Sequence, residues 1–122
     1  MFNLNSYLPM EHNKINVMLL DEASEFLRSL PEKPRKKILY NIQRVERGEV
    51  DEELFEKLND KIWEFRTIFN KVKYRLLSFW DPTQRAMIIA THGFAKTTQK
   101  TPPREIARAE NIRKEYLSEK EK

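Results

Sequence analysis

The apolar positions of the chain follow a helical period up to about residue 48 and a strand period from about residue 62. A short apolar-rich segment, KINVMLL (14–20), predicts a first strand. Two segments separated by prolines then predict helices, because their apolar residues recur at helical spacing: Ala23, Phe26, Leu27 and Leu30, then Ile38, Ile42 and Val45. Asp21 is predicted to cap the first helix and Gly48 to end the second. Because the turn between the two helices is short, they are predicted to form an antiparallel hairpin.

The segment WEFRTIFNKVKYRLL (63–77) alternates apolar and polar side chains on both sides of a central Asn-Lys pair. This alternation predicts a β-hairpin with a two-residue loop, in which Phe69 pairs with Val72. In that register Arg66 lies directly opposite Arg75. Like charges at directly opposite positions of a sheet are destabilising, so the pair calls for a functional or structural explanation.

The nearly continuous apolar run RAMIIATHGF (85–94) predicts a central strand covered on both faces. The acidic segment EVDEELFEKLND (49–60) is compatible with a helical turn or an irregular loop. A last helix is expected after Thr101 and Pro102, which resemble an N-cap and first helical residue. The order predicts a small α+β domain with a largely antiparallel four-stranded sheet, helices against one face, and the other face exposed and concave.

The totals favour one domain with two short tails. The chain has 122 residues and no cysteine, which excludes disulfides and thiolate sites. We expect a flexible N-terminal tail over 1–13, a single domain over 14–117 and a charged C-terminal tail over 118–122. Because there is no apolar run of about 20 residues and no signal-peptide pattern, we expect a cytoplasmic protein that does not bind membranes.

Positive charge is concentrated in the middle of the chain. Residues 57–104 hold 10 Lys/Arg and 3 Asp/Glu, a net charge of +7, within a chain of net charge +4. Residues 1–56 carry a net charge of −3, from 8 Lys/Arg and 11 Asp/Glu, and residues 105–122 are neutral. Such a basic block is typical of a protein that binds a polyanion; the alternative is a solvated face that confers solubility.

Arg66 and Arg75 are the first candidates for binding that polyanion. In the hairpin register their Cβ atoms would lie roughly 5 Å apart on one face. Two guanidinium groups at that distance suit a phosphate, because each can donate two parallel hydrogen bonds. Alternatively, Glu64 or Asp81 pairs with them, or the register slips. Two cations of the loop after the central strand could extend this surface or could simply be solvated: Lys96 and Lys100.

His92 lies near the end of the central strand, where it could transfer protons or could be a hydrogen-bonded core histidine. No cluster of metal-ligating residues occurs in the basic block, and two glycines in total leave no Gly-rich phosphate loop. We therefore expect no metal and no cofactor. RNA suits such a site, because its 2′-hydroxyl is the nucleophile and cations at the scissile phosphate stabilise the transition state.

At this point the sequence resembles toxins of the RelE/ParE superfamily of type II toxin–antitoxin systems, in the HigB-like, phage-related branch. The N-terminal segment FLRSLPEKPRKKILYNIQRVERG (26–48) is similar to the helical hairpin of that family. The remaining resemblance rests on four segments: KLNDKIWEFR (57–66), YRLLSFW (74–80), IIATHGFAKTTQKTP (88–102) and REIARAE (104–110). Thr97 departs from the pattern, since relatives often have a second lysine after Lys96, and the departure lowers the positive charge there.

The resemblance implies a RelE-like fold and an mRNA interferase, an endoribonuclease that cleaves mRNA on the ribosome without metal and leaves a 2′,3′-cyclic phosphate. Arg66 and Arg75 would hold the scissile phosphate, and Lys96 would be a further contact or a base. His92 and Tyr116 are candidates for proton transfer. Three further cations would bind RNA: Lys73, Lys100 and Arg104.

The implied partners are a cognate helix-turn-helix antitoxin, the mRNA and the ribosome, with promoter DNA contacted only through the antitoxin. Two other functions stay open. A ParE-like toxin has the same fold but poisons DNA gyrase by protein–protein contact and needs no catalytic residues. An inactive module would bind only nucleic acid or its antitoxin.

Overall fold

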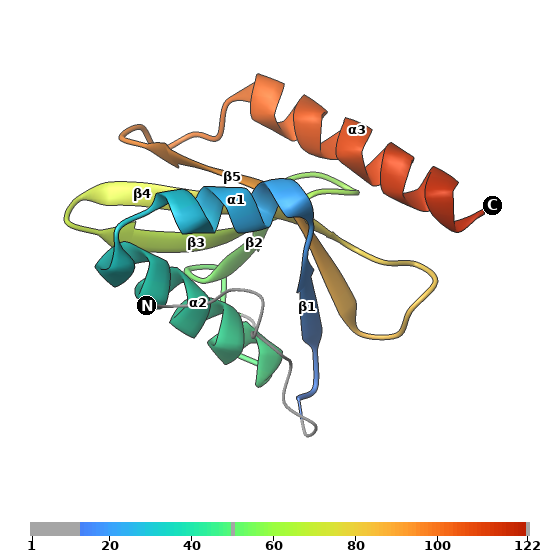
Figure 1. Cartoon of the computed structure of the whole chain (residues 1–122), viewed down its shortest axis with the longest axis horizontal. Coiled ribbons are helices and arrows are strands. Elements are labelled where there is room, and N and C mark those ends of the chain that lie inside the picture. Colours follow the sequence, from blue (N-terminus) through green and yellow to red (C-terminus); the bar gives the residue numbers. More distant parts are fainter. Residues whose placement is uncertain (1–12, 50, 122) are drawn as a thin grey trace.

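The computed structural model describes residues 13–49 and 51–121. Over these ranges the chain forms three helices and one five-stranded sheet, with strand order β1-β5-β4-β3-β2 (Figure 1). The elements in chain order are β1 (Asn16–Leu19), α1 (Asp21–Ser29), α2 (Glu32–Glu46), β2 (Phe55–Lys57), β3 (Trp63–Phe69), β4 (Val72–Trp80), β5 (Met87–Lys96) and α3 (Pro103–Lys120). No helix among the described residues is long and apolar enough to cross a membrane.

Helices cover both faces of the sheet (Figure 1). On one face, α1 and α2 pack their apolar stripes against inward side chains of the strands, with Leu27 and Ile42 fully buried. On the other face, α3 packs Ala109 against Leu77 and Phe79. The expectation that this second face is open and concave is therefore wrong for the part under α3, because the last helix folds back over β4 and β5.

The small α+β fold and its largely antiparallel sheet are confirmed, but the sheet has five strands where the sequence predicts four. β1 pairs in parallel with β5, and every other pairing is antiparallel. The additional strand is β2, which lies in the acidic segment 49–60, where the sequence is compatible with a helical turn or an irregular loop. Phe55 explains its presence: the ring is buried, stacks on Trp63 with 4.9 Å between the centroids, and lies tilted against Phe65 with 4.6 Å between the centroids.

The β3–β4 hairpin has the predicted register, with Phe69 paired to Val72 and Arg66 paired to Arg75. Its two loop residues, Asn70 and Lys71, have φ angles of 49° and 67°. Both are left-handed, as a type I′ turn requires, and this turn matches the twist of the flanking strands. Because a two-residue loop allows only one register between its strands, the turn determines every residue pair along the hairpin.

Gly48 ends helix α2 as predicted, in a left-handed conformation with φ of 102°. Its N–H donates to the carbonyl of Val45 at 2.9 Å, and the N–H of Glu49 donates to that of Arg44 at 3.0 Å. These two bonds form a Schellman motif, which satisfies carbonyls that the helix end would otherwise leave unpaired.

The two predicted N-caps differ from the structure. Asp21 is the first residue of α1, and the cap position is Leu20, without a side-chain hydrogen bond. Helix α3 begins at Pro103 with Pro102 at the cap position, and the Thr101 hydroxyl donates instead to Glu64. Helix α3 also continues to Lys120, so part of the expected C-terminal tail is helical, whereas residues 1–12 of the expected N-terminal tail lie outside the described residues.

Candidate functional site

Four cationic side chains lie together on one face of β3, β4 and β5, toward the hairpin turn. Arg66 pairs with Arg75 across β3 and β4, and Lys73 pairs with Lys96 across β4 and β5. Directly paired residues project from the same face, and so do residues two apart on one strand. These four residues therefore form one surface, which we call the cationic patch. It contains two like-charge pairs side by side, each of which costs stability.

Glu64 supplies negative charge at the centre of the cationic patch. It lies two residues before Arg66 on β3 and is 3 % exposed. Its Oε2 atom is 3.6 Å from Arg66 Nε and 3.5 Å from Arg75 Nε. Its Oε1 atom accepts a 2.6 Å hydrogen bond from the Thr101 hydroxyl, which in turn accepts one from Lys96 Nζ at 3.1 Å. The two arginines thus pair with Glu64, the first of the alternatives open from the sequence.

The two arginines differ in how far a ligand can reach them. The side chain of Arg75 is 1 % exposed, and its Nε atom has no hydrogen-bond partner among the described residues. Burial lowers the pKa of Arg75, although Glu64 opposes the shift. The side chain of Arg66 is 26 % exposed and donates to Glu56 Oε2 at 2.7 Å. A phosphate on this face would therefore contact Arg66, while Arg75 contributes its charge from beneath.

Lys96 is held at the edge of the cationic patch by the loop that follows β5. Its ammonium group donates to the carbonyl of Gln99 at 2.8 Å and to the Thr101 hydroxyl. Partial burial lowers the pKa of Lys96, Glu64 raises it, and the neighbouring cations Arg75, Arg66 and Lys73 lower it further. The direction of this shift means that Lys96 loses its proton more readily than a solvated lysine does.

His92 lies under helix α3 and is 2 % exposed. Its Nε2 atom is 3.1 Å from Glu105 Oε1, and its Nδ1 atom is 3.0 Å from the Thr91 hydroxyl. Burial lowers its pKa, and the hydrogen bond to Glu105 opposes that shift. This is the geometry of the hydrogen-bonded core histidine considered as the alternative to a proton-transfer role. Among residues 13–49 and 51–121, no group of three or more His, Cys, Asp or Glu could hold a metal ion.

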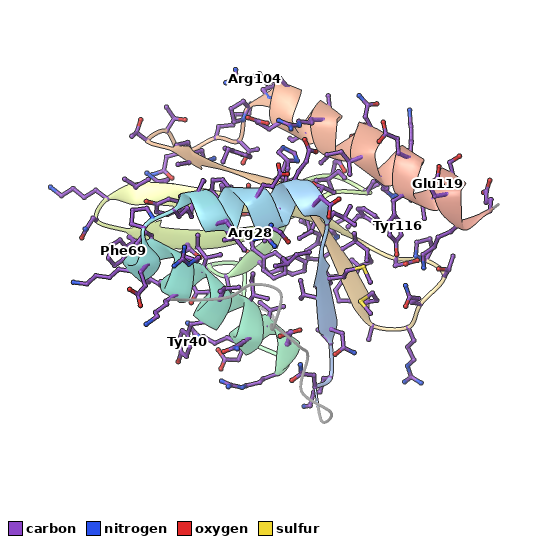
Figure 2. The ribbon with its side chains drawn as sticks, in the orientation of Figure 1. Arg28, Tyr40, Phe69, Arg104, Tyr116 and Glu119 are labelled. Atoms are coloured by element: carbon purple, nitrogen blue, oxygen red, sulfur yellow. The ribbon has the colours of Figure 1, made fainter. Side chains whose placement is uncertain are left out.

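Tyr116 lies away from the cationic patch, toward the far end of α3 from Arg104 (Figure 2). Its hydroxyl donates to Asp81 Oδ2 at 2.6 Å, just beyond the end of β4. Asp81 is six residues after Arg75, which is about 20 Å along an extended strand. Burial and the bond to Asp81 raise the pKa of Tyr116. The structure thus separates this candidate for proton transfer from Arg66, Arg75 and Lys96.

Asp81 fastens α3 to the β4–β5 loop. Burial alone would raise its pKa, but hydrogen bonds from Tyr116, Thr83 and Gln84 hold the pKa well below its usual range. Lys120 adds an ion pair at 3.0 Å. Because all these partners belong to the loop or to the end of α3, we assign Asp81 and Tyr116 a structural role here.

The three other predicted RNA-binding residues lie at different places. Lys73 belongs to the cationic patch, Lys100 is exposed in the loop that holds Lys96, and Arg104 is exposed in the first turn of α3. The sequence already offers Glu64 as a partner of the two arginines, because it lies two residues before Arg66 on the same face. Sequence reasoning missed its hydrogen bond with Thr101. It also missed the Lys73–Lys96 pair, because a bulge between Leu77 and Ser78 shifts the β4–β5 register.

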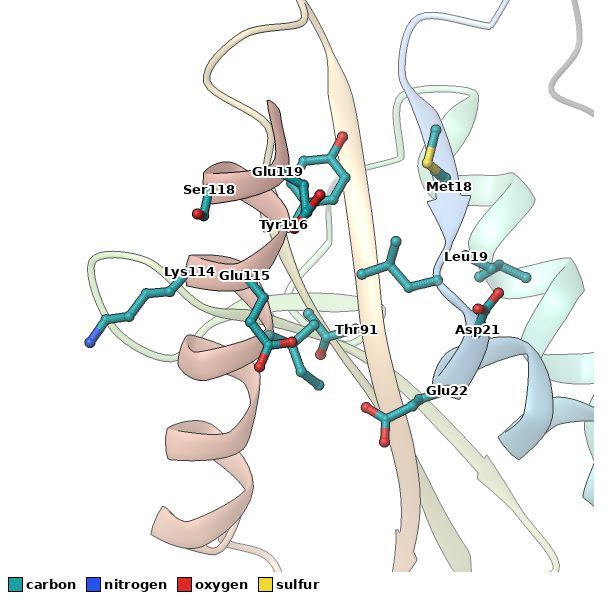
Figure 3. A pocket seen from close by; sticks show the side chains of 12 residues that line it. Met18, Leu19, Asp21, Glu22, Thr91, Lys114, Glu115, Tyr116, Ser118 and Glu119 are labelled. Carbon is teal, nitrogen blue, oxygen red and sulfur yellow. The ribbon is translucent and has the colours of Figure 1, made fainter. Parts of the chain in front are cut away.

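A hollow of about 1000 Å³ lies between α3 and the end of β1, away from the cationic patch (Figure 3). Its apolar lining includes Met18 and Ile112, and its charged lining is mainly acidic: Asp21, Glu22, Lys114, Glu115 and Glu119. Carboxylates repel phosphate, so this hollow is unsuited to a polyanion. The cationic patch therefore remains the candidate site for one.

Comparison with protein-family models matches residues 25–114, about three quarters of the chain, to the family described as phage derived protein Gp49-like (DUF891). A search of the curated proteins gives no match. The matched segment includes the second half of α1, all of α2, all of β2 to β5 and most of α3. The chain belongs to the Gp49-like family of phage-derived proteins, within the RelE/ParE-like superfamily of toxins of toxin–antitoxin systems.

Proposed function

We propose that this protein is a toxin of the HigB-like branch that cleaves mRNA on the ribosome at the cationic patch, without a metal ion. The observation that carries the proposal is the presence of two like-charge cross-strand pairs on neighbouring strands, Arg66 with Arg75 and Lys73 with Lys96. A fold retains such costly pairs when a polyanionic ligand uses them. The family itself implies a toxin and an antitoxin partner.

The proposed reaction uses the nucleophile that RNA carries. The 2′-oxygen attacks the adjacent phosphorus, the bond from phosphorus to the 5′-oxygen breaks, and a 2′,3′-cyclic phosphate and a 5′-hydroxyl form. Arg66 contacts the phosphate and, with the buried charge of Arg75, stabilises the additional negative charge of the transition state. Lys96 in its neutral form takes the 2′-hydroxyl proton, which its lowered pKa favours. The 5′-oxygen receives a proton from water.

The remaining partners follow from this proposal. Three further cations, Lys73, Lys100 and Arg104, bind the RNA backbone. Lys73 lies in the cationic patch, Lys100 in the loop that holds Lys96, and Arg104 in the first turn of α3, which follows that loop. The antitoxin is of the helix-turn-helix type and holds the promoter DNA, which the toxin contacts only through it.

Cleavage is tested by expressing the wild type, Arg66→Ala and Arg85→Ala in cells and mapping transcript 5′ ends. Arg85 is the matched control, because it is exposed in the β4–β5 loop and its loss removes the same charge away from the cationic patch. We expect new cuts within translated messages for the wild type and Arg85→Ala. Arg66→Ala should cut about 100-fold less, the scale of losing one transition-state contact. Equal cutting by the two variants would overturn the assignment of Arg66.

A second candidate is a ParE-like toxin that acts on DNA gyrase by protein–protein contact. The burial of Arg75 and the pairing of both arginines with Glu64 favour it, because they also fit a purely structural network. The same expression experiment separates the candidates. Growth arrest with DNA damage and no new transcript ends would favour the gyrase target, and no arrest at all would favour a module that only binds its partners.

A further inference from the structure

We propose that a groove between α2 and β3 binds the single-stranded RNA that flanks the cleaved phosphate, with Tyr40 as a platform for one base. This inference rests on the proposed function. The groove has a volume of about 440 Å³ and is lined from α2 by Lys37, Asn41 and Arg44. From the sheet it is lined by Arg66, Thr67 and Arg75, so it shares two residues with the cationic patch. Because Arg66 and Thr67 project from opposite faces of β3, the groove meets the patch around the edge of that strand.

The groove exists because β2 is shorter than β3. The β2–β3 pairing stops at Phe55 and Phe65, so within residues 13–49 and 51–121 no strand lies beside the edge of β3 beyond Arg66. Lys37 Nζ donates to the carbonyl of Ile68 on this edge. A lysine placed on an open edge discourages the addition of another strand, which makes a β-strand of a partner protein a poor occupant.

Charge favours a polyanion in the groove. Its lining residues include four cations, Lys37, Arg44, Arg66 and Arg75, and one carboxylate, Glu53. The ion pair of Arg44 with Glu49 is exposed, at 36 % and 50 % of the two side chains, and such pairs contribute about 0–1 kcal/mol. A phosphate can therefore replace Glu49 at little cost. Lys37 uses one of its three ammonium donors on Ile68.

Tyr40 offers a nucleic acid a contact that a simple anion cannot use, because its exposed ring can stack on a base. It is 54 % exposed and points outward from α2 (Figure 2). Lys37 and Arg44, three and four residues away, share its side of the helix, and the Arg44 guanidinium is 5.9 Å from the ring centroid. An exposed aromatic ring between cations is the arrangement on which single-stranded bases stack, at about 1–3 kcal/mol per base.

The basic character of α2 is hidden in the charge totals of the chain. The helix carries five Lys/Arg and two Asp/Glu, a net charge of +3, although residues 1–56 together are net acidic. Folding moves this helix beside β3, so its cations join those of the middle segment. The path for RNA therefore runs from the groove past Arg66 to Lys96.

The test measures binding of a fluorescent single-stranded RNA 12-mer to the purified full chain over a range of salt concentrations. Tyr40→Ala should weaken binding about 5- to 150-fold, whereas Tyr40→Phe, which keeps the ring, should bind as the wild type does. Arg44→Gln should weaken binding and reduce the salt slope by about 0.7, the value for one phosphate contact on a single strand. Arg85→Gln is the matched control for Arg44→Gln, because Arg85 is exposed in the β4–β5 loop and does not line the groove.

If the wild type cuts transcripts, but Tyr40→Ala and Arg44→Gln bind RNA as tightly as the wild type, the proposed role of the groove is refuted and the proposed function stands. Wild-type protein that neither cuts nor binds RNA would overturn the proposed function as well. Binding of a poly-glutamate peptide that depends on Tyr40, without binding of RNA, would overturn the inference in favour of an acidic protein partner.

Discussion

Replacing Glu64 by Gln removes one buried negative charge and leaves the shape of the site almost unchanged. The glutamine can still accept the hydrogen bond from Thr101, but Arg75, which is 1 % exposed, loses its ion-pair partner at 3.5 Å. Breaking a buried pair by removing one partner costs about 3–5 kcal/mol. Because 3.5 Å is longer than a charge-assisted hydrogen bond, we expect the lower end, about 3 kcal/mol. A chain of 122 residues has a total stability of about 6–18 kcal/mol.

Urea denaturation followed by tryptophan fluorescence measures this loss. Trp63 and Trp80 report on the sheet, since they lie on β3 and β4 with ring centroids 6.3 Å apart. With a denaturant slope of about 1–3 kcal/mol per molar urea, the unfolding midpoint should fall by about 1–3 M. Glu56→Gln is the control: its carboxylate also pairs with Arg66 but is 39 % exposed, so the loss should stay below about 1 kcal/mol.

The same variant, Glu64→Gln, tests whether the Glu64 carboxylate neutralises the cations that would bind a phosphate. In Glu64→Gln the cationic patch lacks its central anion, so sulfate should stabilise the variant more than the wild type when compared with chloride at equal ionic strength. If Glu64→Gln is as stable as the wild type and indifferent to sulfate, Glu64 does not neutralise the two arginines and the electrostatic reasoning is refuted.

Three further predictions concern the scaffold and are checked by urea denaturation. Lys71→Gly should raise the free energy of unfolding by about 1 kcal/mol, because Lys71 has a φ of 67° in the turn with Asn70; an unchanged midpoint would contradict the strain. Gly93→Ala should lower it by about 1–3 kcal/mol, since the added methyl would overlap the Phe26 ring, and a neutral effect would show that the ring moves freely. The folded protein lowers the pKa of Asp81, so the stabilisation by its carboxylate is fully present above the unfolded pKa of about 3.9 and is lost as the pH falls. Asp81→Asn should therefore be less stable than the wild type at pH 7. The difference in unfolding free energy should shrink toward pH 2, and a difference that does not change with pH would contradict this role.

Local rules are sufficient for the hairpin and for the end of α2. A two-residue loop fixes the register that places Arg66 opposite Arg75, and Gly48 alone provides the left-handed residue at the helix end. The short strand β2 could not be predicted in this way. Its three residues give too little alternation, and it forms because Phe55 fits among aromatic rings that only the folded chain brings together.

The candidate site is predictable only as far as one hairpin extends. Lys73 and Lys96 come together through a β4–β5 register that a bulge shifts, and no turn chemistry indicates that bulge. The position of Thr101 beside Glu64 depends on the path of the loop after β5, and long-range contacts decide it. Tyr116 shares a helical stripe with core residues, and the length of α3 carries it to Asp81 at the other end of the sheet.

The central claim, that the cationic patch cleaves RNA by attack of the 2′-hydroxyl, is tested most directly by the chemistry of the RNA ends. Transcripts from cells expressing the wild type or Lys96→Met would be sequenced with selective capture of 5′-hydroxyl ends. We predict abundant 5′-hydroxyl ends within messages for the wild type, and at least about 100-fold fewer for folded Lys96→Met. Cuts that carry 5′-phosphates, or 5′-hydroxyl ends equally abundant in the variant, would contradict the account.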